Sequence, residues 1–204
     1  MLDALATPDV AGVARRLLGA VVTSELGDVR VSVRLTEVEA YAGVGEDPAS
    51  HAHRGRTPRN AVMFGPPGRA YLYFVYGMHW CLNVVTGPAG HASAVLLRAG
   101  EVVEGLEAAR SRRPSAGRDR DLARGPARLA ATLGITSDTA PQVNNVDLLG
   151  PRSPVRVLIA EPTGLQVIES SARVGVGDAA AETPWRFLLA GEETVSPYRR
   201  ASGR

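Results

Sequence analysis

The stretch that decides the fold runs from Val29 to Tyr41 and reads Val-Arg-Val-Ser-Val-Arg-Leu-Thr-Glu-Val-Glu-Ala-Tyr. Apolar and polar residues alternate with a period of two, which predicts a half-buried β-strand. Continuing the apolar face of residues 31–35 places Glu37, Glu39 and Tyr41 on the core side. Carboxylates there are paired, hydrogen-bonded or held for chemistry, because an uncompensated buried charge is costly. Glu39 is therefore a candidate general base, and the alternative is that Glu37 or Glu39 simply pairs with an arginine.

Regular elements are expected on both sides of this strand. Thr7 can cap a helix that has Pro8 at its first position and ends at Gly19. Two strand-like runs, 70–75 and 79–85, are joined through Tyr76-Gly77-Met78 and predict a β-hairpin. Strands are also expected over 94–99, 155–159 and 185–189, and helices over 101–113 and 125–133. No internal repeat or domain boundary is visible, so residues 1–204 should form one domain.

Two segments near this strand carry polar and aromatic residues in unusual density. Residues 42–69 form a long loop rich in glycine and proline, and a loop of this length in a compact domain is usually functional or disordered. The hairpin holds five of the ten aromatic residues, so rings are concentrated there: Tyr71, Tyr73, Phe74, Tyr76 and Trp80. Tyr76 stands beside the turn, where a large ring is poorly buried unless something else receives it.

Composition excludes several classes of chemistry. All 23 basic residues are arginine, so a lysine Schiff base and a Gly-Lys-Ser/Thr phosphate loop are both excluded. A single cysteine, Cys81, excludes an internal disulfide, a four-cysteine zinc site and an iron–sulfur cluster. No run approaches the roughly 18 apolar residues of a membrane span, and the N-terminus lacks a signal-peptide pattern. We therefore expect a cytoplasmic protein that does not contact membranes.

Arginines cluster in two places although the formal net charge is only +2. Seven lie between Arg110 and Arg128 against two acidic residues, and a second group sits in the long loop. Clusters of this kind favour binding of a polyanion, and the alternative is a solvated surface that reflects coding bias. The predicted backbone-contacting residues are Arg54, Arg56, Arg59, Arg110, Arg112 and Arg113.

The remaining catalytic groups favour hydrolysis of a flat, polyanionic substrate. His51 and His53 with Asp47 are a weak candidate metal site, and we expect neither a metal nor an organic cofactor. Glu39 supplies a general base for water, the rings supply stacking surfaces and the arginines supply phosphate contacts. A nucleobase in DNA fits this set. The alternatives are a non-catalytic nucleic-acid-binding protein, against which the two glutamates argue, and a metal-dependent hydrolase acting on a nucleotide.

These residues also carry a resemblance to a known family. Its motifs, in chain order, are Arg15-Arg16-Leu17-Leu18-Gly19, Glu37-Val38-Glu39-Ala40-Tyr41, His51, Arg54-Gly55-Arg56-Thr57-Pro58-Arg59-Asn60, Met63-Phe64, Tyr71-Leu72-Tyr73-Phe74-Val75-Tyr76-Gly77-Met78, Asn83, Val95-Leu96-Leu97-Arg98, Leu122-Ala123-Arg124-Gly125-Pro126, Arg173-Val174-Gly175-Val176 and Pro184-Trp185-Arg186-Phe187. They resemble the mammalian-type 3-methyladenine (alkyladenine, methylpurine) DNA glycosylase family, and the absence of a long tail before the first helix resembles its bacterial members.

The resemblance implies both a fold and an activity. The fold would be a single compact α+β domain with a curved antiparallel sheet, surrounding helices and a protruding hairpin that enters the DNA minor groove. The activity would be base-excision repair by a monomeric, monofunctional glycosylase that acts on double-stranded DNA and associates with the nucleoid when bound. It would flip alkylated or deaminated purines (3-methyladenine, 7-methylguanine, hypoxanthine, ethenoadenine) and hydrolyse the N-glycosidic bond to leave an abasic site.

The resemblance also assigns roles to individual residues. Glu39 matches the general base that activates the attacking water, and Arg98 matches an arginine near that water and the backbone. Tyr76 matches the hairpin residue that fills the gap in the duplex. The base pocket matches Tyr41, His51, Tyr73 and Asn83, of which Asn83 disfavours the guanine 2-amino group. One additional residue between Tyr41 and His51, relative to the mammalian pattern, leaves Ser50 as a competitor for the position of His51.

Overall fold

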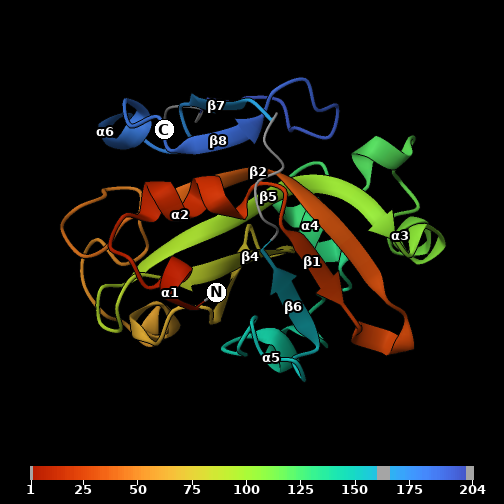
Figure 1. The fold of residues 1–204 in the computed structure, drawn as a ribbon, viewed down its shortest axis with the longest axis horizontal. Coiled ribbons are helices and arrows are strands. Elements are labelled where there is room, and N and C mark those ends of the chain that lie inside the picture. The colour runs from red at the N-terminus through yellow and green to blue at the C-terminus, as the bar shows by residue number, and fades with distance from the viewer. Residues whose placement is uncertain (1, 160–165, 201–204) are drawn as a thin grey trace.

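One antiparallel sheet of eight strands occupies the centre of the molecule (Figure 1). The computed structural model describes residues 2–159 and 166–200. Neighbouring strands follow the order β3-β4-β5-β2-β1-β6, while β8 pairs with both β2 and β7. The strands are β1 (Val21–Ser24), β2 (Val31–Tyr41), β3 (Ala70–Val75), β4 (His79–Thr86), β5 (Ser93–Glu104), β6 (Val155–Leu158), β7 (Ile168–Ser171) and β8 (Arg186–Leu189).

Short helices surround this sheet (Figure 1). They are α1 (Leu2–Leu5), α2 (Val10–Leu17), α3 (Leu106–Arg112), α4 (Pro126–Thr132), α5 (Ala140–Val143) and α6 (Asp178–Ala181), with 3₁₀ turns at Leu26–Asp28, Ala61–Phe64 and Asp119–Asp121. The predicted single α+β domain with a curved antiparallel sheet is confirmed, although its predicted limits at residues 1 and 204 lie outside the described residues. In the described part of the chain, no helix is both long and apolar enough to cross a membrane.

The central strand β2 contains an irregularity that reverses its faces. Its pairing with β5 shifts register between Leu35 and Glu37 and again between Glu37 and Val38, which marks a β-bulge. Leu35 and Val38 therefore both lie in the hydrophobic core. Gly100 lies opposite Leu35, and a Cβ atom at this glycine would overlap the carbonyl oxygen of Arg34. The expectation that Glu37, Glu39 and Tyr41 continue the core face is wrong, because the bulge moves them to the opposite face.

The two faces of the sheet have different roles. Directly opposed residues on antiparallel strands point to the same side. Val38 opposes Leu97, and both belong to the core, where α2 and α4 pack against the sheet. Glu39 opposes Leu96, which in turn opposes Asn83. Leu96 and Asn83 line a pocket, so this face carries the candidate site.

Two predicted helices begin elsewhere than expected. Asp9, not Thr7, caps α2, because its carboxylate accepts the Gly12 amide at 2.9 Å. The region 101–113 is a strand up to Glu104, since Val102 pairs with Val33 and extends the sheet. Gly105, with φ +76°, separates this strand from α3. The predicted hairpin, the helix near 125–133 and both late strands are confirmed.

Candidate active site

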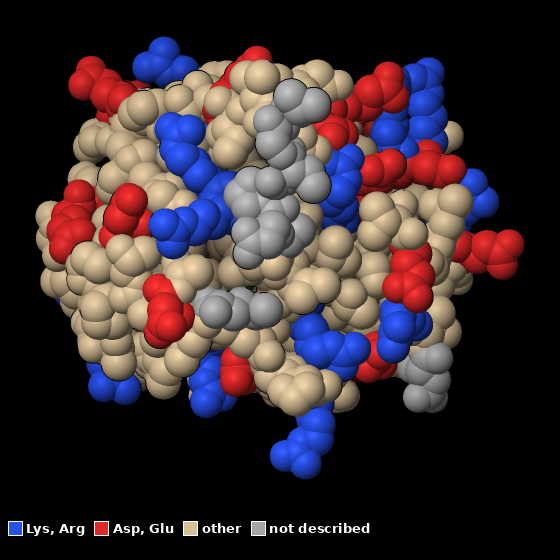
Figure 2. Space-filling view, in the orientation of Figure 1, with Lys and Arg blue, Asp and Glu red and all other residues tan. Residues whose placement is uncertain are grey.

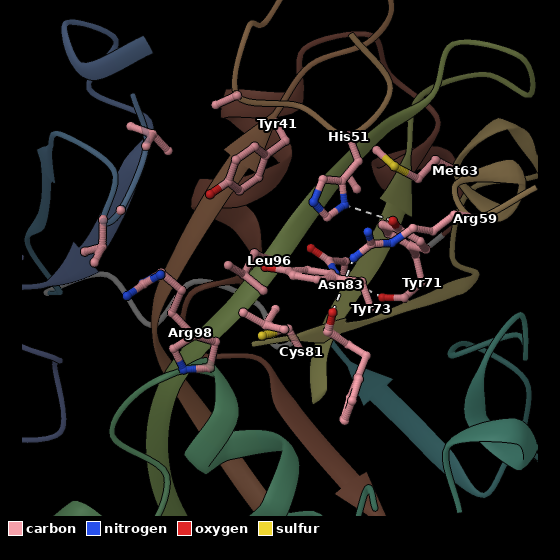
Figure 3. A pocket seen from close by; sticks show the side chains of 18 of the residues that line it. Tyr41, His51, Arg59, Met63, Tyr71, Tyr73, Cys81, Asn83, Leu96 and Arg98 are labelled. Carbon is pink, nitrogen blue, oxygen red and sulfur yellow. Dashed lines mark hydrogen bonds between the residues drawn. The ribbon is translucent and has the colours of Figure 1, made fainter. Parts of the chain in front are cut away.

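A pocket of about 760 Å³ opens on the face of the sheet opposite the core (Figure 3). It brings together seven of the predicted site residues, from β2, β3, β4, β5, the hairpin turn and the long loop: Tyr41, His51, Arg59, Tyr73, Tyr76, Asn83 and Arg98. Arg98 lies at one end, and Arg59 and Met63 lie at the other (Figure 3). Glu39 does not line the pocket, because its side chain is completely buried directly behind this wall.

The aromatic part of the pocket is held by a short chain of contacts. His51 Nδ1 lies 2.9 Å from the Tyr71 hydroxyl, and its ring is 4.6 Å from the Tyr73 ring and nearly perpendicular to it. Asn83 Nδ2 donates to the Tyr71 carbonyl at 3.0 Å. Of the two candidates for the loop position, His51 reaches the pocket, whereas Ser50 Oγ accepts the Ala52 amide inside its own turn.

Desolvation favours the neutral form of each titratable side chain of this group. Desolvation lowers the pKa of His51, and the positive charge of Arg59 lowers it further. Burial raises the pKa of Tyr71 to about 12 and also raises that of Tyr73. It raises the pKa of the Cys81 thiol to about 11, so this thiol is not a nucleophile near neutral pH. The pocket thus offers neutral rings to a ligand.

Glu39 is held by three hydrogen bonds, all of which come from residues that line the pocket. Its Oε1 accepts the Val174 amide at 2.7 Å, and its Oε2 accepts the Tyr41 hydroxyl at 2.9 Å and Arg98 Nη1 at 3.1 Å. Oε1 therefore has one donor and Oε2 has two. Burial raises the pKa of Glu39 above its ordinary value, against the opposing effects of Arg98 and the two other hydrogen bonds.

Glu37, two residues earlier, has a denser set of donors. Arg98 Nε and Arg186 Nε approach its Oε1 at 2.8 and 2.7 Å. Ser196 donates its amide to Oε2 at 2.6 Å and its hydroxyl to Oε1 at 2.9 Å. Burial alone would raise the pKa of Glu37, but the two guanidinium groups outweigh it and lower this pKa. Both glutamates therefore pair with Arg98, but the pKa of Glu39 is raised and that of Glu37 is lowered.

Arg173, which sequence reasoning left without a role, joins the long loop to Tyr41 in the pocket wall. Its guanidinium binds both oxygens of Asp47 at 2.6 and 2.8 Å and lies 4.7 Å from the centre of the Tyr41 ring. Asp47 is thus committed to an ion pair. Among residues 2–159 and 166–200, no group of three side chains could hold a metal ion. The only advance signal was the Arg173-Val174-Gly175-Val176 motif, whose Val174 amide contacts Glu39.

Tyr76 occupies the tip of the hairpin and is one of the residues that line the pocket. Its side chain is 83% exposed, and its φ of +53° lies in the left-handed region, followed by Gly77 at +70°. A non-glycine residue in this region is strained by about 1–2 kcal/mol. The hairpin therefore holds a large ring away from the body of the protein.

The predicted phosphate-contacting arginines differ in their exposure and in whether they already bind other groups of the protein. Arg59 lines the pocket and donates to the Phe74 carbonyl at 3.3 Å, and the exposed Arg56 lies over the Phe64 ring. Arg54 is exposed and Arg113 half-buried. Arg110 pairs with Asp119 at 2.8 Å, while Arg112 donates to the carbonyls of Leu26 and Thr132. Arginine and acidic side chains are intermixed on the face seen in Figure 2.

Comparison with known proteins shows the family of this chain. The sequence model of the methylpurine-DNA glycosylase family matches residues 4–193. The chain belongs to this family. A protein of Nocardia farcinica is 53% identical over 192 residues, which cover 92% of this chain and 86% of that protein. One of Streptomyces avermitilis is 49% identical (96% and 90% covered), and one of Mycobacterium tuberculosis is 46% identical (95% and 92% covered). All three are named "Putative 3-methyladenine DNA glycosylase".

Membership of the methylpurine-DNA glycosylase family confirms the predicted resemblance. It also confirms that the chain is an enzyme, a DNA glycosylase of DNA repair. DNA is accordingly the polymer on which this chain acts.

Proposed function

We propose that this glycosylase flips a damaged purine out of double-stranded DNA and hydrolyses its N-glycosidic bond with a water activated by Glu39. The observation that carries the proposal is the placement of a buried carboxylate, with its pKa raised, directly behind a pocket of neutral aromatic rings. A general base operates best when its pKa lies closer to the working pH than that of a free glutamate. The reaction leaves an abasic site.

The pocket suits a nucleobase in size and in chemistry. Its volume of about 760 Å³ lies in the range of small-molecule sites, roughly 300–1,000 Å³. Tyr41, His51 and Tyr73 would enclose the base, since flat rings gain most from stacking. Alkylation at N3 or N7 makes a purine cationic, which strengthens its attraction to a tyrosine face and makes it a better leaving group. Cationic lesions such as 3-methyladenine and 7-methylguanine are therefore the proposed preferred substrates.

Asn83 provides discrimination at the floor of the pocket. Its Nδ2 already donates to the Tyr71 carbonyl, which fixes the orientation of the amide. A buried donor that meets another donor is left without a partner, which costs about 1–3 kcal/mol. We propose that the 2-amino group of unmodified guanine is disfavoured in this way, and that the positive charge of 7-methylguanine offsets this cost for the alkylated base. Hypoxanthine and ethenoadenine lack that group but require protonation as they leave.

The hydrolytic water would bind the Glu39 carboxylate from the pocket side. All three hydrogen-bond donors to this carboxylate line the pocket, so a water among them would reach both Glu39 and the sugar. Glu39 takes a proton from this water as the water attacks C1′, and the purine departs with the bonding electrons. Arg98 would orient the water and the ionised carboxylate.

Tyr76 would fill the gap left by the flipped nucleotide. Flipping costs a few kcal/mol of unstacking, and a ring inserted from the minor groove restores part of it. A side chain that is 83% exposed in a strained conformation is difficult to explain by packing alone. Arg54, Arg56 and Arg59 would contact the flanking phosphates, and one monomer would be sufficient for the reaction.

Replacement of Glu39 tests the proposal. Glu39→Gln retains size and hydrogen bonding but removes the base, so release from a duplex with one 7-methylguanine should fall by about 10²- to 10⁴-fold while lesion binding persists. Glu101→Gln is a matched control, because Glu101 is an ion-paired glutamate of the same sheet, outside the pocket. Base release by Glu39→Gln at the rate of this control would refute the role of Glu39.

A further inference from the structure

We infer that Glu37, together with Ser196, is a positioning residue that holds Arg98 against Glu39. The inference rests on the proposed role of Glu39. Glu37 is completely buried and does not line the pocket, so it touches neither substrate nor water there. It binds Nε of Arg98, while Nη1 of the same guanidinium binds Glu39. One rigid planar group therefore spans both carboxylates, and Glu37 fixes its angle.

A neutral side chain at position 37 could not accept all the hydrogen bonds that are donated to Glu37. Four donors converge on it: Arg98 Nε, Arg186 Nε and the amide and hydroxyl of Ser196. A carboxylate offers about four acceptor positions, whereas a glutamine has one acceptor oxygen and an amide that donates. A glutamine at this position would leave at least one buried donor facing another. Of the residues that donate to Glu37, only Arg98 lines the pocket. Its guanidinium is therefore the donor that has space to move.

The segment after β8 closes this arrangement. Thr194 shares a hydrogen bond with Thr36, and the Ser196 carbonyl accepts Arg186 Nη2 at 2.6 Å. The Ser196 hydroxyl lies 3.5 Å from Arg98 Nη2. A segment about 160 positions from Glu37 in the sequence therefore completes the site from behind. Because Ser196 lies so far from Glu37 in the sequence, no local sequence pattern assigned it a role.

Glu37 could influence Glu39 by positioning Arg98 or by its own negative charge. The direction in which the pH profile shifts when Glu37 is neutralised distinguishes these two roles. The titratable and charged groups facing Glu39 are Glu37 and Tyr41 from β2, Tyr73 from β3, Cys81 from β4, Arg98 from β5, and Arg173 after β7. After burial itself, Arg98 has the largest influence on the pKa of Glu39 and lowers it, whereas Glu37 raises it less. If Glu37 only repels Glu39, its neutralisation lowers this pKa. If Glu37 holds Arg98 in place, its neutralisation releases Arg98 and raises this pKa.

The experiment is the pH dependence of single-turnover base release from a duplex with one 7-methylguanine, whose fixed positive charge removes the need to protonate the leaving base. Glu37→Gln should lower the plateau rate by about 10- to 100-fold, the effect of a misplaced catalytic group, and move the acid limb to higher pH. Ser196→Ala keeps every charge, and it should lower the plateau rate and move the acid limb to higher pH by smaller amounts. Glu101→Gln should match the unmodified enzyme.

Several results would overturn the inference while leaving the proposed function intact. An acid limb of Glu37→Gln that stays in place or moves to lower pH, with Glu39→Gln inactive, would show that Glu37 does not position Arg98. If Glu37→Gln fails to fold, Ser196→Ala decides, and an unchanged rate and profile would refute the inference. A fully active Glu39→Gln would instead refute the proposed function.

Discussion

Removing the Tyr76 ring should weaken DNA binding and leave the free energy of unfolding unchanged or slightly higher. The Tyr76 side chain is 83% exposed, so Tyr76→Ser removes little buried surface and should change the free energy of unfolding by less than about 0.5 kcal/mol. Tyr76→Gly also relieves the left-handed backbone at φ +53°, worth about 1–2 kcal/mol, against about 0.4–1 kcal/mol of added freedom in the unfolded chain. The glycine variant should therefore be as stable as the unmodified protein, or more stable by up to about 1.5 kcal/mol.

Both variants should bind damaged duplex less tightly. Losing one base–aromatic stack weakens binding by about 1–3 kcal/mol, or about 5- to 150-fold in Kd. Anisotropy with a duplex containing a tetrahydrofuran abasic analogue measures this loss without turnover, and the same analogue in single-stranded DNA serves as the control because it has no duplex gap. Equal losses on the two ligands would refute gap filling, and a clearly destabilised Tyr76→Gly would show that the ring serves packing.

Three further predictions concern the base, the arginines and the reaction product. Because burial raises the pKa of Glu39 and the ionised form is required, kcat should fall on the acid side at a higher pH than an ordinary glutamate would give, and a plateau that extends through the ordinary glutamate range would contradict this. Arg112→Gln should lower the free energy of unfolding by about 1–3 kcal/mol without changing the salt dependence of DNA binding, since Arg112 serves two backbone carbonyls, whereas Arg59→Gln should reduce the slope of log Kd on log salt by about 1. The chain has no lysine, so borohydride during turnover should trap no covalent protein–DNA adduct, and an observed adduct would point to an amine nucleophile instead of water.

The elements with strong local signals could be predicted from the sequence. The hairpin had two alternating runs and a short turn, and the late strands had apolar runs of the right length. The helix expected from residue 101 failed because pairing of Val102 with Val33 outweighed helical periodicity. The long loop was expected to be functional or disordered, and in the structure its residues His51 and Arg59 line the pocket.

The bulge in β2 was missed although the sequence contains its signal. Thr36 and Glu37 are two successive polar residues between Leu35 and Val38, which is the mark of an interrupted alternation. Two partners of Glu37 could not be predicted, because Arg186 and Ser196 lie about 150 to 160 positions away and form no local pattern with it. Roles assigned by the resemblance thus covered residues of the pocket wall and Glu39, but not Arg186 and Ser196.

The bulge also determines which genetic changes this strand can survive. Deleting the codon for Thr36 would remove the extra residue of the bulge and leave Glu37, Val38 and Glu39 on their present faces, whereas deleting the codon for Val38 would turn Glu39 into the apolar core. A buried, unpaired ion costs several kcal/mol, which is a large part of the total stability of about 5–15 kcal/mol of an ordinary domain. A library selected for folding should therefore lose the deletion of codon 38 far more often than the deletion of codon 36.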